Sequence, residues 1–120
     1  MVMVLLATDS DEIAEETFAA LVTSETTVSR VHRGEDVREV ALEIEPDLVI
    51  LDLQIGNMGG VATSIDLQHE IAAGRLKPMK IIMLLDRHAD LWIASEAKVD
   101  AELVKPLNAL QLRKKAESLL

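Results

Sequence analysis

The sequence predicts an α/β fold, a five-stranded doubly wound parallel sheet made of five consecutive strand and helix units. First, short apolar runs alternate along the chain with longer stretches whose apolar residues recur at helical spacing. Second, three of the apolar runs are hydrophobic throughout, as expected for strands covered by helices on both faces of a parallel sheet. Since the chain has 120 residues, of which 49% are hydrophobic, we expect a single domain, residues 1–120, around one core.

The first half of the chain is expected to contain three strands and two helices. The run at 2–7 (VMVLLA) is wholly apolar, and the helix expected at 11–22 has its large apolar residues broadly on one side. The segment 26–31 (TTVSRV) alternates and is rich in β-branched residues, which favours a strand. The helix expected at 35–44 has apolar residues at positions i, i+3, i+4 and i+7. The apolar run at 47–51 (DLVIL) is the third strand.

The second half is expected to add two strands and three helices. A long helical stretch at 61–73 is followed by Gly74, the residue type that most often ends a helix. The last helix has an apolar face at helical spacing, and Asn108 is suited to cap its N-terminus. The remaining elements are an apolar strand at 80–85, a short helix at 89–97, a brief strand at 102–104 and the last helix at 109–119.

Composition excludes several classes of function. The formal net charge of −9 argues against a nucleic-acid partner, because binding to phosphates depends on clustered Lys and Arg. No apolar run approaches the ~20 residues that span a bilayer, and the N-terminus lacks the basic flank of a signal peptide, so we expect no membrane partner. The absence of cysteine excludes disulfides and thiolate metal sites, and it fits a cytoplasmic protein.

Charged side chains follow the predicted strands. Asp9 follows the first strand, Asp52 the third and Lys105 the fifth. In doubly wound folds, binding sites lie beyond the carboxyl ends of the strands, where the strand order reverses. We therefore expect these two carboxylates and this lysine to converge in one site.

At these positions the sequence resembles the receiver domain of bacterial two-component response regulators, over essentially the whole chain. The resemblance rests on Thr8-Asp9, on PDLVILD at 46–52, on the glycine pair at 59–60 and on LVKP at 103–106, in this order and on the expected elements. It implies a flavodoxin-like fold with strand order 2-1-3-4-5. It also implies a signalling phosphoprotein of a two-component phosphorelay, which is not an enzyme.

The resemblance further implies the roles of the site residues. Asp52 matches the aspartate that accepts a phosphoryl group from a sensor histidine kinase or phosphotransfer protein. Lys105 matches the lysine that pairs with that group, and the Lys105-Pro106 bond resembles the cis peptide of the family. Asp9, Asp52 and the backbone carbonyl of Gln54 match the ligands of Mg²⁺. This chemistry suits the residue types, because a carboxylate can attack phosphorus once the phosphate charge is neutralised.

Several residues depart from the family pattern. Thr8 stands where the family has a second acid, which should weaken the Mg²⁺ site. Leu85 replaces the Ser or Thr that normally donates to the phosphoryl group, and Glu102 replaces the usual Tyr or Phe, so the switch that reads out phosphorylation should be altered. Gly56 replaces a typical proline. Asp86 follows the fourth strand, and we hypothesise that it lies near the pocket or pairs with Lys105.

Some interpretations stay open at the level of the sequence. Asp52 could be a capping aspartate, although its neighbours favour the functional role. Asp9 could instead complement the N-terminus of the first helix, or do both. Trp92 is expected to pack partly buried, with a partner anchor as the other interpretation. The helix at 89–97, the strand at 102–104 and the last helix form the face that the family uses for homodimers or effectors.

Two functions therefore remain. The leading hypothesis is phosphoryl acceptance at Asp52 with an altered switch. The alternative is an atypical receiver that acts as a protein-interaction module without phosphorylation. A flavodoxin-like cofactor binder is disfavoured, because the chain has no phosphate-binding loop motif and few aromatic residues to stack a ring.

Overall fold

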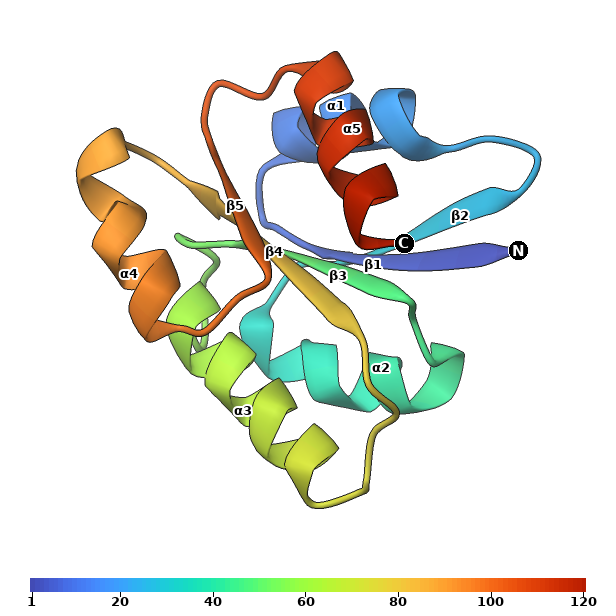
Figure 1. The fold of residues 1–120 in the computed structure, drawn as a ribbon, viewed down its shortest axis with the longest axis vertical. Coiled ribbons are helices and arrows are strands. Elements are labelled where there is room, and N and C mark those ends of the chain that lie inside the picture. The colour runs from blue at the N-terminus through green and yellow to red at the C-terminus, as the bar shows by residue number, and fades with distance from the viewer.

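The computed structural model describes residues 1–120 and confirms the predicted fold class and strand order (Figure 1). Five parallel strands form one sheet in the order β2-β1-β3-β4-β5. The strands are β1 Val2–Ala7, β2 Thr26–Val31, β3 Leu48–Asp52, β4 Lys80–Leu85 and β5 Ala101–Val104. The helices are α1 Asp11–Leu21, α2 Val37–Ile44, α3 Gly60–Ala72, α4 Leu91–Glu96 and α5 Ala109–Leu119, with 3₁₀ turns η1 Gly34–Asp36 and η2 His88–Asp90. None of these helices is long and apolar enough to cross a membrane.

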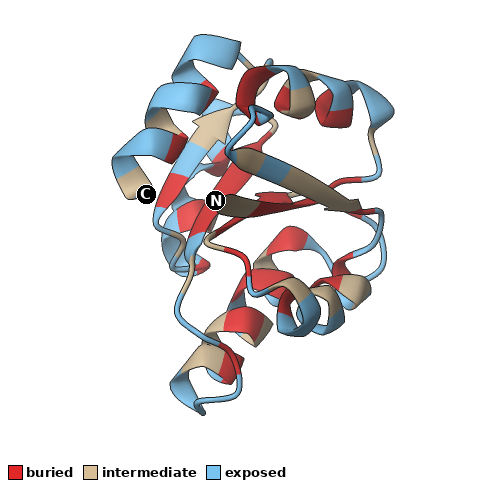
Figure 2. Cartoon of the chain, turned by 90° about the vertical axis from the view of Figure 1, so that its right-hand side faces the viewer, coloured by how far each residue is buried: buried red, intermediate tan, exposed pale blue.

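Helices cover both faces of the sheet, which explains the wholly apolar strands. Helices α1 and α5 lie on one face and α2, α3 and α4 on the other (Figure 1). In β3, Leu48 and Ile50 pack with the first group, while Val49 and Leu51 pack toward α2 and α3. Figure 2 shows buried residues along the strands between the two helical layers. The carboxyl ends of all five strands therefore meet at one edge of a two-sided core.

Two helices are shorter than the sequence predicts. The segments expected as helices at 35–44 and 89–97 each begin with a 3₁₀ turn, η1 and η2, so α4 has only six residues. Before α4, the backbone N–H of Arg87 donates to Asp90 Oδ2 at 3.2 Å, and the Arg87 guanidinium donates to Asp90 Oδ1 at 3.1 Å. Together with the backbone N–H of Asp90, which donates to the carbonyl of Arg87 at 2.9 Å, these bonds close the chain into a tight turn at the point where the α-helix was expected to start.

Helix α4 is fastened to α3 at its C-terminal end. Ser64 and Gln68, one turn apart on α3, donate to the carbonyl oxygen of Ala97 at 3.0 and 2.8 Å, and Gln68 also donates to the carbonyl of Lys98 at 3.0 Å. These bonds satisfy carbonyl groups that have no partner within α4. Beneath the helix, Leu85 packs with Met83, Ala94 and Ala97 in a small apolar cluster.

The turn after β2 packs directly against the loop between β3 and α3. The backbone N–H of Gly34 donates to the carbonyl of Gly56, and that of Glu35 donates to the carbonyl of Asn57, both at 3.2 Å. A Cβ atom on Gly34 would collide with the Met58 carbonyl oxygen and lie 2.5 Å from Thr63 Oγ1. Glycine is therefore required here by a close approach of two backbone segments.

Candidate functional site

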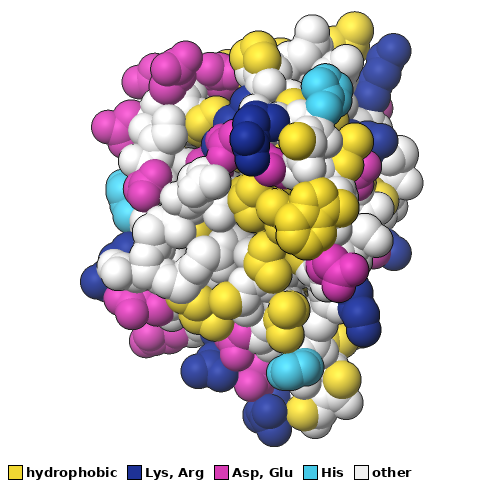
Figure 3. Space-filling view, turned by 90° about the vertical axis from the view of Figure 1, so that its left-hand side faces the viewer, with side chains coloured by type: hydrophobic (Ala, Val, Ile, Leu, Met, Phe, Trp, Pro, Cys, Tyr) yellow, Lys and Arg dark blue, Asp and Glu magenta, His cyan; other side chains and the backbone are white.

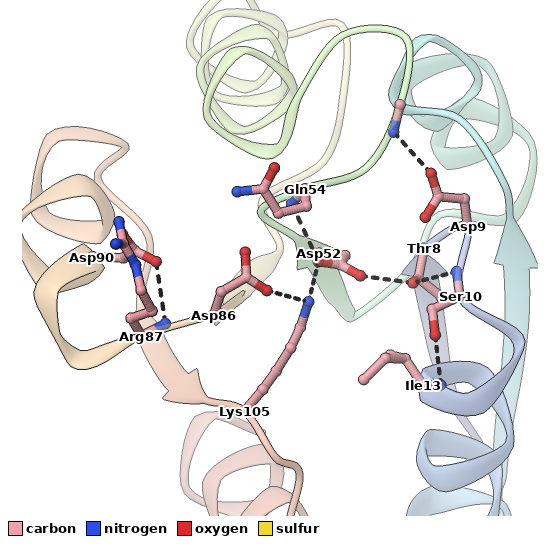
Figure 4. A network of polar contacts seen from close by, with 11 residues as sticks. Thr8, Asp9, Ser10, Ile13, Asp52, Gln54, Asp86, Arg87, Asp90 and Lys105 are labelled. Atoms are coloured by element: carbon pink, nitrogen blue, oxygen red, sulfur yellow. Dashed lines mark hydrogen bonds and ion pairs between the residues drawn. The ribbon is translucent and has the colours of Figure 1, made fainter.

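Side chains from four strand ends converge at the carboxyl edge of the sheet (Figure 4). Asp52, the last residue of β3, is 2% exposed. Lys105, which follows β5, places Nζ 2.7 Å from Asp52 Oδ1 and 2.9 Å from Asp86 Oδ1. Thr8, which follows β1, donates from Oγ1 to Asp52 Oδ2 at 2.8 Å. One lysine is thus held between two carboxylates, and one of these carboxylates is buried.

Each oxygen of the buried Asp52 carboxylate has a donor. Oδ2 accepts from Thr8, and Oδ1 accepts from Lys105 and from the backbone N–H of Gln54 at 3.2 Å. The Thr8 hydroxyl oxygen itself accepts from the backbone N–H of Ser10 at 3.1 Å, so its single proton is directed toward Asp52. The buried carboxylate therefore has hydrogen bonds that offset the cost of its burial.

The lysine is held in its charged form. Burial opposes the charge, but the hydrogen bonds and charges of Asp52 and Asp86 outweigh burial and raise the pKa of Lys105 above its ordinary value. Its side chain is about four-fifths buried, with an exposed fraction of 20%. The Lys105-Pro106 peptide bond is cis. The ammonium group is therefore available as a fixed positive charge beside Asp52.

Asp9 faces the loop between β3 and α3. Its Oδ2 accepts from the backbone N–H of Gly56 at 3.3 Å (Figure 4). The N-terminus of α1 is capped by Ser10, whose Oγ accepts from the backbone N–H of Ile13 at 3.2 Å. Ser10 therefore supplies the helix cap, and Asp9 stands on the site side of the strand end.

The oxygen atoms at this edge of the sheet are of the type that binds a hard divalent cation. Asp9 and Asp52 lie at the ends of the paired strands β1 and β3. Each accepts a hydrogen bond from a backbone N–H of the loop between β3 and α3, the 53–59 loop. Mg²⁺ is bound through one or two carboxylates and keeps several of its waters. No three acidic or histidine side chains are placed so that together they could hold a metal ion, and the side chain beside Asp52 at the end of β1 is the hydroxyl of Thr8. The protein thus offers two carboxylates, with the Gln54 carbonyl on the same loop.

The structure places the remaining residues singled out by the sequence. Leu85 is fully buried in the apolar cluster under α4, while Glu102 is exposed on β5. Asp86 pairs with Lys105, in agreement with the hypothesis made from its position. The expectation that Trp92 packs partly buried is wrong, because 67% of it is exposed. The contact of Thr8 with Asp52 was not anticipated, although the position of Thr8 at a strand end beside Asp9 could have indicated it.

Comparison with solved structures supports the fold. The chain superimposes with a TM-score of 0.87 on the signal receiver domain of a signal transduction histidine kinase from Syntrophus aciditrophicus, with 23% identity, covering 100% of this chain and 90% of that one. The chemotaxis protein CheY4 of Vibrio cholerae matches with a TM-score of 0.85, 22% identity and coverages of 100% and 99%. The receiver domain of NtrX from Brucella abortus matches with a TM-score of 0.84 and 19% identity, covering 98% of this chain and 97% of that one. No curated protein matches the sequence significantly.

The family is shown by the sequence itself. The model of the response regulator receiver domain matches residues 4–117, which is nearly the whole chain. This range includes every side chain of the converging site described above. The chain therefore belongs to the response regulator receiver domain family of two-component signalling systems.

Proposed function

We propose that this receiver domain accepts a phosphoryl group on Asp52 from a sensor histidine kinase or a phosphotransfer protein. Receiver domains as a family accept phosphoryl groups and interact with such donors. The observation that carries the proposal for this chain is the contact of the buried Asp52 carboxylate with Lys105, at 2.7 Å. A nucleophile and a neutralising cation are thus fixed side by side at the edge where such folds bind ligands.

The proposed step is a direct phosphoryl transfer. Thr8 donates to Oδ2 of Asp52, and we assign Oδ1, the oxygen beside Lys105, as the one that attacks phosphorus while the ammonium group of Lys105 turns to the phosphoryl oxygens. The new P–O bond forms as the P–N bond to the donor histidine breaks, and the imidazole nitrogen keeps the electron pair and takes up a proton. Lys105 offsets the negative charge that gathers on the phosphoryl oxygens. The site thus supplies positioning and charge, which are the main requirements of this reaction.

A bound Mg²⁺ ion would be held by Asp9, Asp52 and the backbone carbonyl of Gln54. Receiver domains generally bind Mg²⁺ at the phosphorylation site, where it neutralises phosphate charge. In this chain the replacement of an acid by Thr8 removes one negative charge from the site. We therefore propose a weakened Mg²⁺ site.

The Thr8→Asp variant is expected to bind Mg²⁺ about ten- to thirtyfold more tightly. A further carboxylate about 4 Å from a divalent cation gains about 2 kcal/mol even at the dielectric constant of water. Without metal, the variant should melt at a lower temperature than the parent, because the Thr8 hydrogen bond is replaced by repulsion from Asp52. Melting curves across a Mg²⁺ titration measure both effects. Equal Mg²⁺ dependence in the two proteins would contradict the proposed metal site.

The readout of phosphorylation is proposed to differ from the usual switch. Leu85 has no hydroxyl group and is enclosed in the cluster under α4, and Glu102 is not an aromatic residue. These features favour, as a second candidate, an interaction module that works without phosphorylation.

Figure 3 shows hydrophobic side chains gathered on the α3 and α4 side of the molecule, where Trp92 is exposed. We propose the adjoining face of α4, β5 and α5 as the contact for a homodimer or an effector.

Incubation with a small phosphoramidate donor and Mg²⁺ tests the proposed function. We expect the intact mass to increase by one phosphoryl group, and the increase to be lost with a chelator. Hydroxylamine should remove the group, because it cleaves acyl phosphates and leaves phosphate esters of Ser and Thr intact. Protein that stays unmodified with small donors and with kinases would favour the phosphorylation-independent module.

A further inference from the structure

Asp86 is the acidic residue of the site that has no role in the proposed transfer step. It follows β4, the strand between β3 and β5, and its carboxylate lies 2.9 Å from Lys105 Nζ. Its side chain is one-third exposed, whereas that of Asp52 is buried. Figure 4 shows the lysine reaching up between the two carboxylates. Asp52 and Asp86 therefore compete for a single positive charge.

Asp86 is also the residue whose side chain joins the segment after β4 to the site. The side chain of the preceding residue, Leu85, packs into the apolar cluster and cannot donate or accept, and Leu85 contacts Lys105 only through its backbone carbonyl, which accepts from the Lys105 N–H at 2.8 Å. The following residue, Arg87, is tied to Asp90 by a backbone and a side-chain hydrogen bond. These bonds close a short turn that leads from Asp86 to Asp90, the residue directly before α4. A displacement of Asp86 would thus be passed on to α4.

Phosphorylation changes the competition for Lys105. It replaces the single charge of the Asp52 carboxylate with the roughly two charges of a phosphoryl group. The site becomes more negative by about one charge, whether or not a cation is bound. Lys105 is then drawn to the phosphoryl oxygens, while Asp86 loses its partner and faces a like charge at close range.

We propose that Asp86 is a positioning residue that holds Lys105 before phosphorylation, and that its release afterwards carries the signal into residues 86–96. This inference rests on the proposed phosphorylation of Asp52. In this mechanism the segment after β4 is pushed out of the site by charge repulsion, and no hydroxyl group at position 85 is needed. Repulsion of the negative charge of Asp86 thus takes the place of the hydrogen bond that a hydroxyl group at position 85 would donate.

The Asp86→Asn variant separates this role from a merely structural one. Before phosphorylation, the Lys105 side chain should become more mobile in the variant, which ¹³Cε relaxation measures. After phosphorylation, amide hydrogen exchange in residues 86–96 should accelerate in the parent, and this acceleration should be lost in the variant although its mass still increases by one phosphoryl group. The Glu96→Gln variant is the matched control, because it removes one exposed, unpaired charge from α4 and should behave as the parent in both measurements.

Each result decides the proposal. An unchanged Lys105 ¹³Cε relaxation in Asp86→Asn, or an acceleration of exchange equal to that of the parent, would overturn the role of Asp86. A parent protein that cannot be phosphorylated would overturn the proposed function and the release step together. In that case the Lys105 ¹³Cε relaxation still decides whether Asp86 positions the lysine.

Discussion

Replacement of Asp52 by asparagine is expected to abolish phosphoryl acceptance, with a fall of at least about a thousandfold in rate, or about 4 kcal/mol in activation free energy. An amide has nearly the shape of the carboxylate, and its oxygen can still accept from Lys105 while its NH₂ group, in place of Oδ2, can donate to the Thr8 hydroxyl oxygen, so the fold should persist. It lacks the anionic oxygen that would form the P–O bond. Asp86 is the other carboxylate held by Lys105, but it follows a different strand, β4, and lacks the Thr8 contact.

The measurement is the gain in intact mass over time with a phosphoramidate donor and Mg²⁺. Asp66→Asn is the matched control, since Asp66 pairs with Arg38 on the surface and its loss should leave the rate unchanged. A hydroxylamine-sensitive phosphoryl group on the Asp52→Asn protein would show that another carboxylate is the acceptor. Loss of modification in both variants would point to a general effect of charge.

The Gly34→Ala variant is expected to lower the free energy of unfolding by about 3 kcal/mol, at the upper end of the usual cost of overpacking. The added methyl group would meet the backbone carbonyl of Met58, which cannot rotate away as a side-chain tip could. To relieve the contact, the two segments must separate, and the hydrogen bonds from Gly34 and Glu35 to the 53–59 loop must lengthen. Urea unfolding followed by circular dichroism gives this free energy.

Gly59→Ala is the control for that variant. Gly59 lies in the same loop with φ of −57°, and a Cβ atom there would come no closer than 3.8 Å to a neighbour, the Leu53 carbonyl oxygen. Its substitution should change the free energy of unfolding by less than about 1 kcal/mol. Equal losses in the two variants would indicate that the loop tolerates no side chain at all, and not that the approach at Gly34 is decisive.

The fold could be predicted because its strongest determinants are local patterns. The run Leu48–Leu51 is apolar on every residue, and in the structure its side chains enter the core on both faces of the sheet. Asn108 caps α5 as expected, accepting from the backbone N–H of Gln111 at 3.0 Å. Charged residues at strand ends converge because parallel strands share one carboxyl edge, which brings Asp52 and Lys105 together from 53 residues apart.

Features that depend on distant contacts could not be predicted in the same way. Thr8 and Asp52 are 44 residues apart, and a threonine at a strand end is also an ordinary turn residue. The need for glycine at position 34 arises from the 53–59 loop, which the local sequence does not reveal. The start of α4 could not be predicted either, because its first predicted turn is a 3₁₀ turn closed by the contact of Arg87 with Asp90.

Because α4 is hydrogen-bonded to α3 at its C-terminal end, a movement of this helix would be a rotation about that end. The hydrogen bonds from Ser64 and Gln68 fix the end at Ala97, whereas the opposite end connects to the site through the turn that carries Asp86. Six residues at 1.5 Å each give an arm of about 9 Å, so a rotation of about 10° moves its far end by about 1.5 Å. Trp92 is the second residue of α4 and lies next to that far end, so its indole ring would be displaced more than the side chains nearer Ala97. A small electrostatic change at Asp52 would thus be enlarged into a change in the outline of the protein surface.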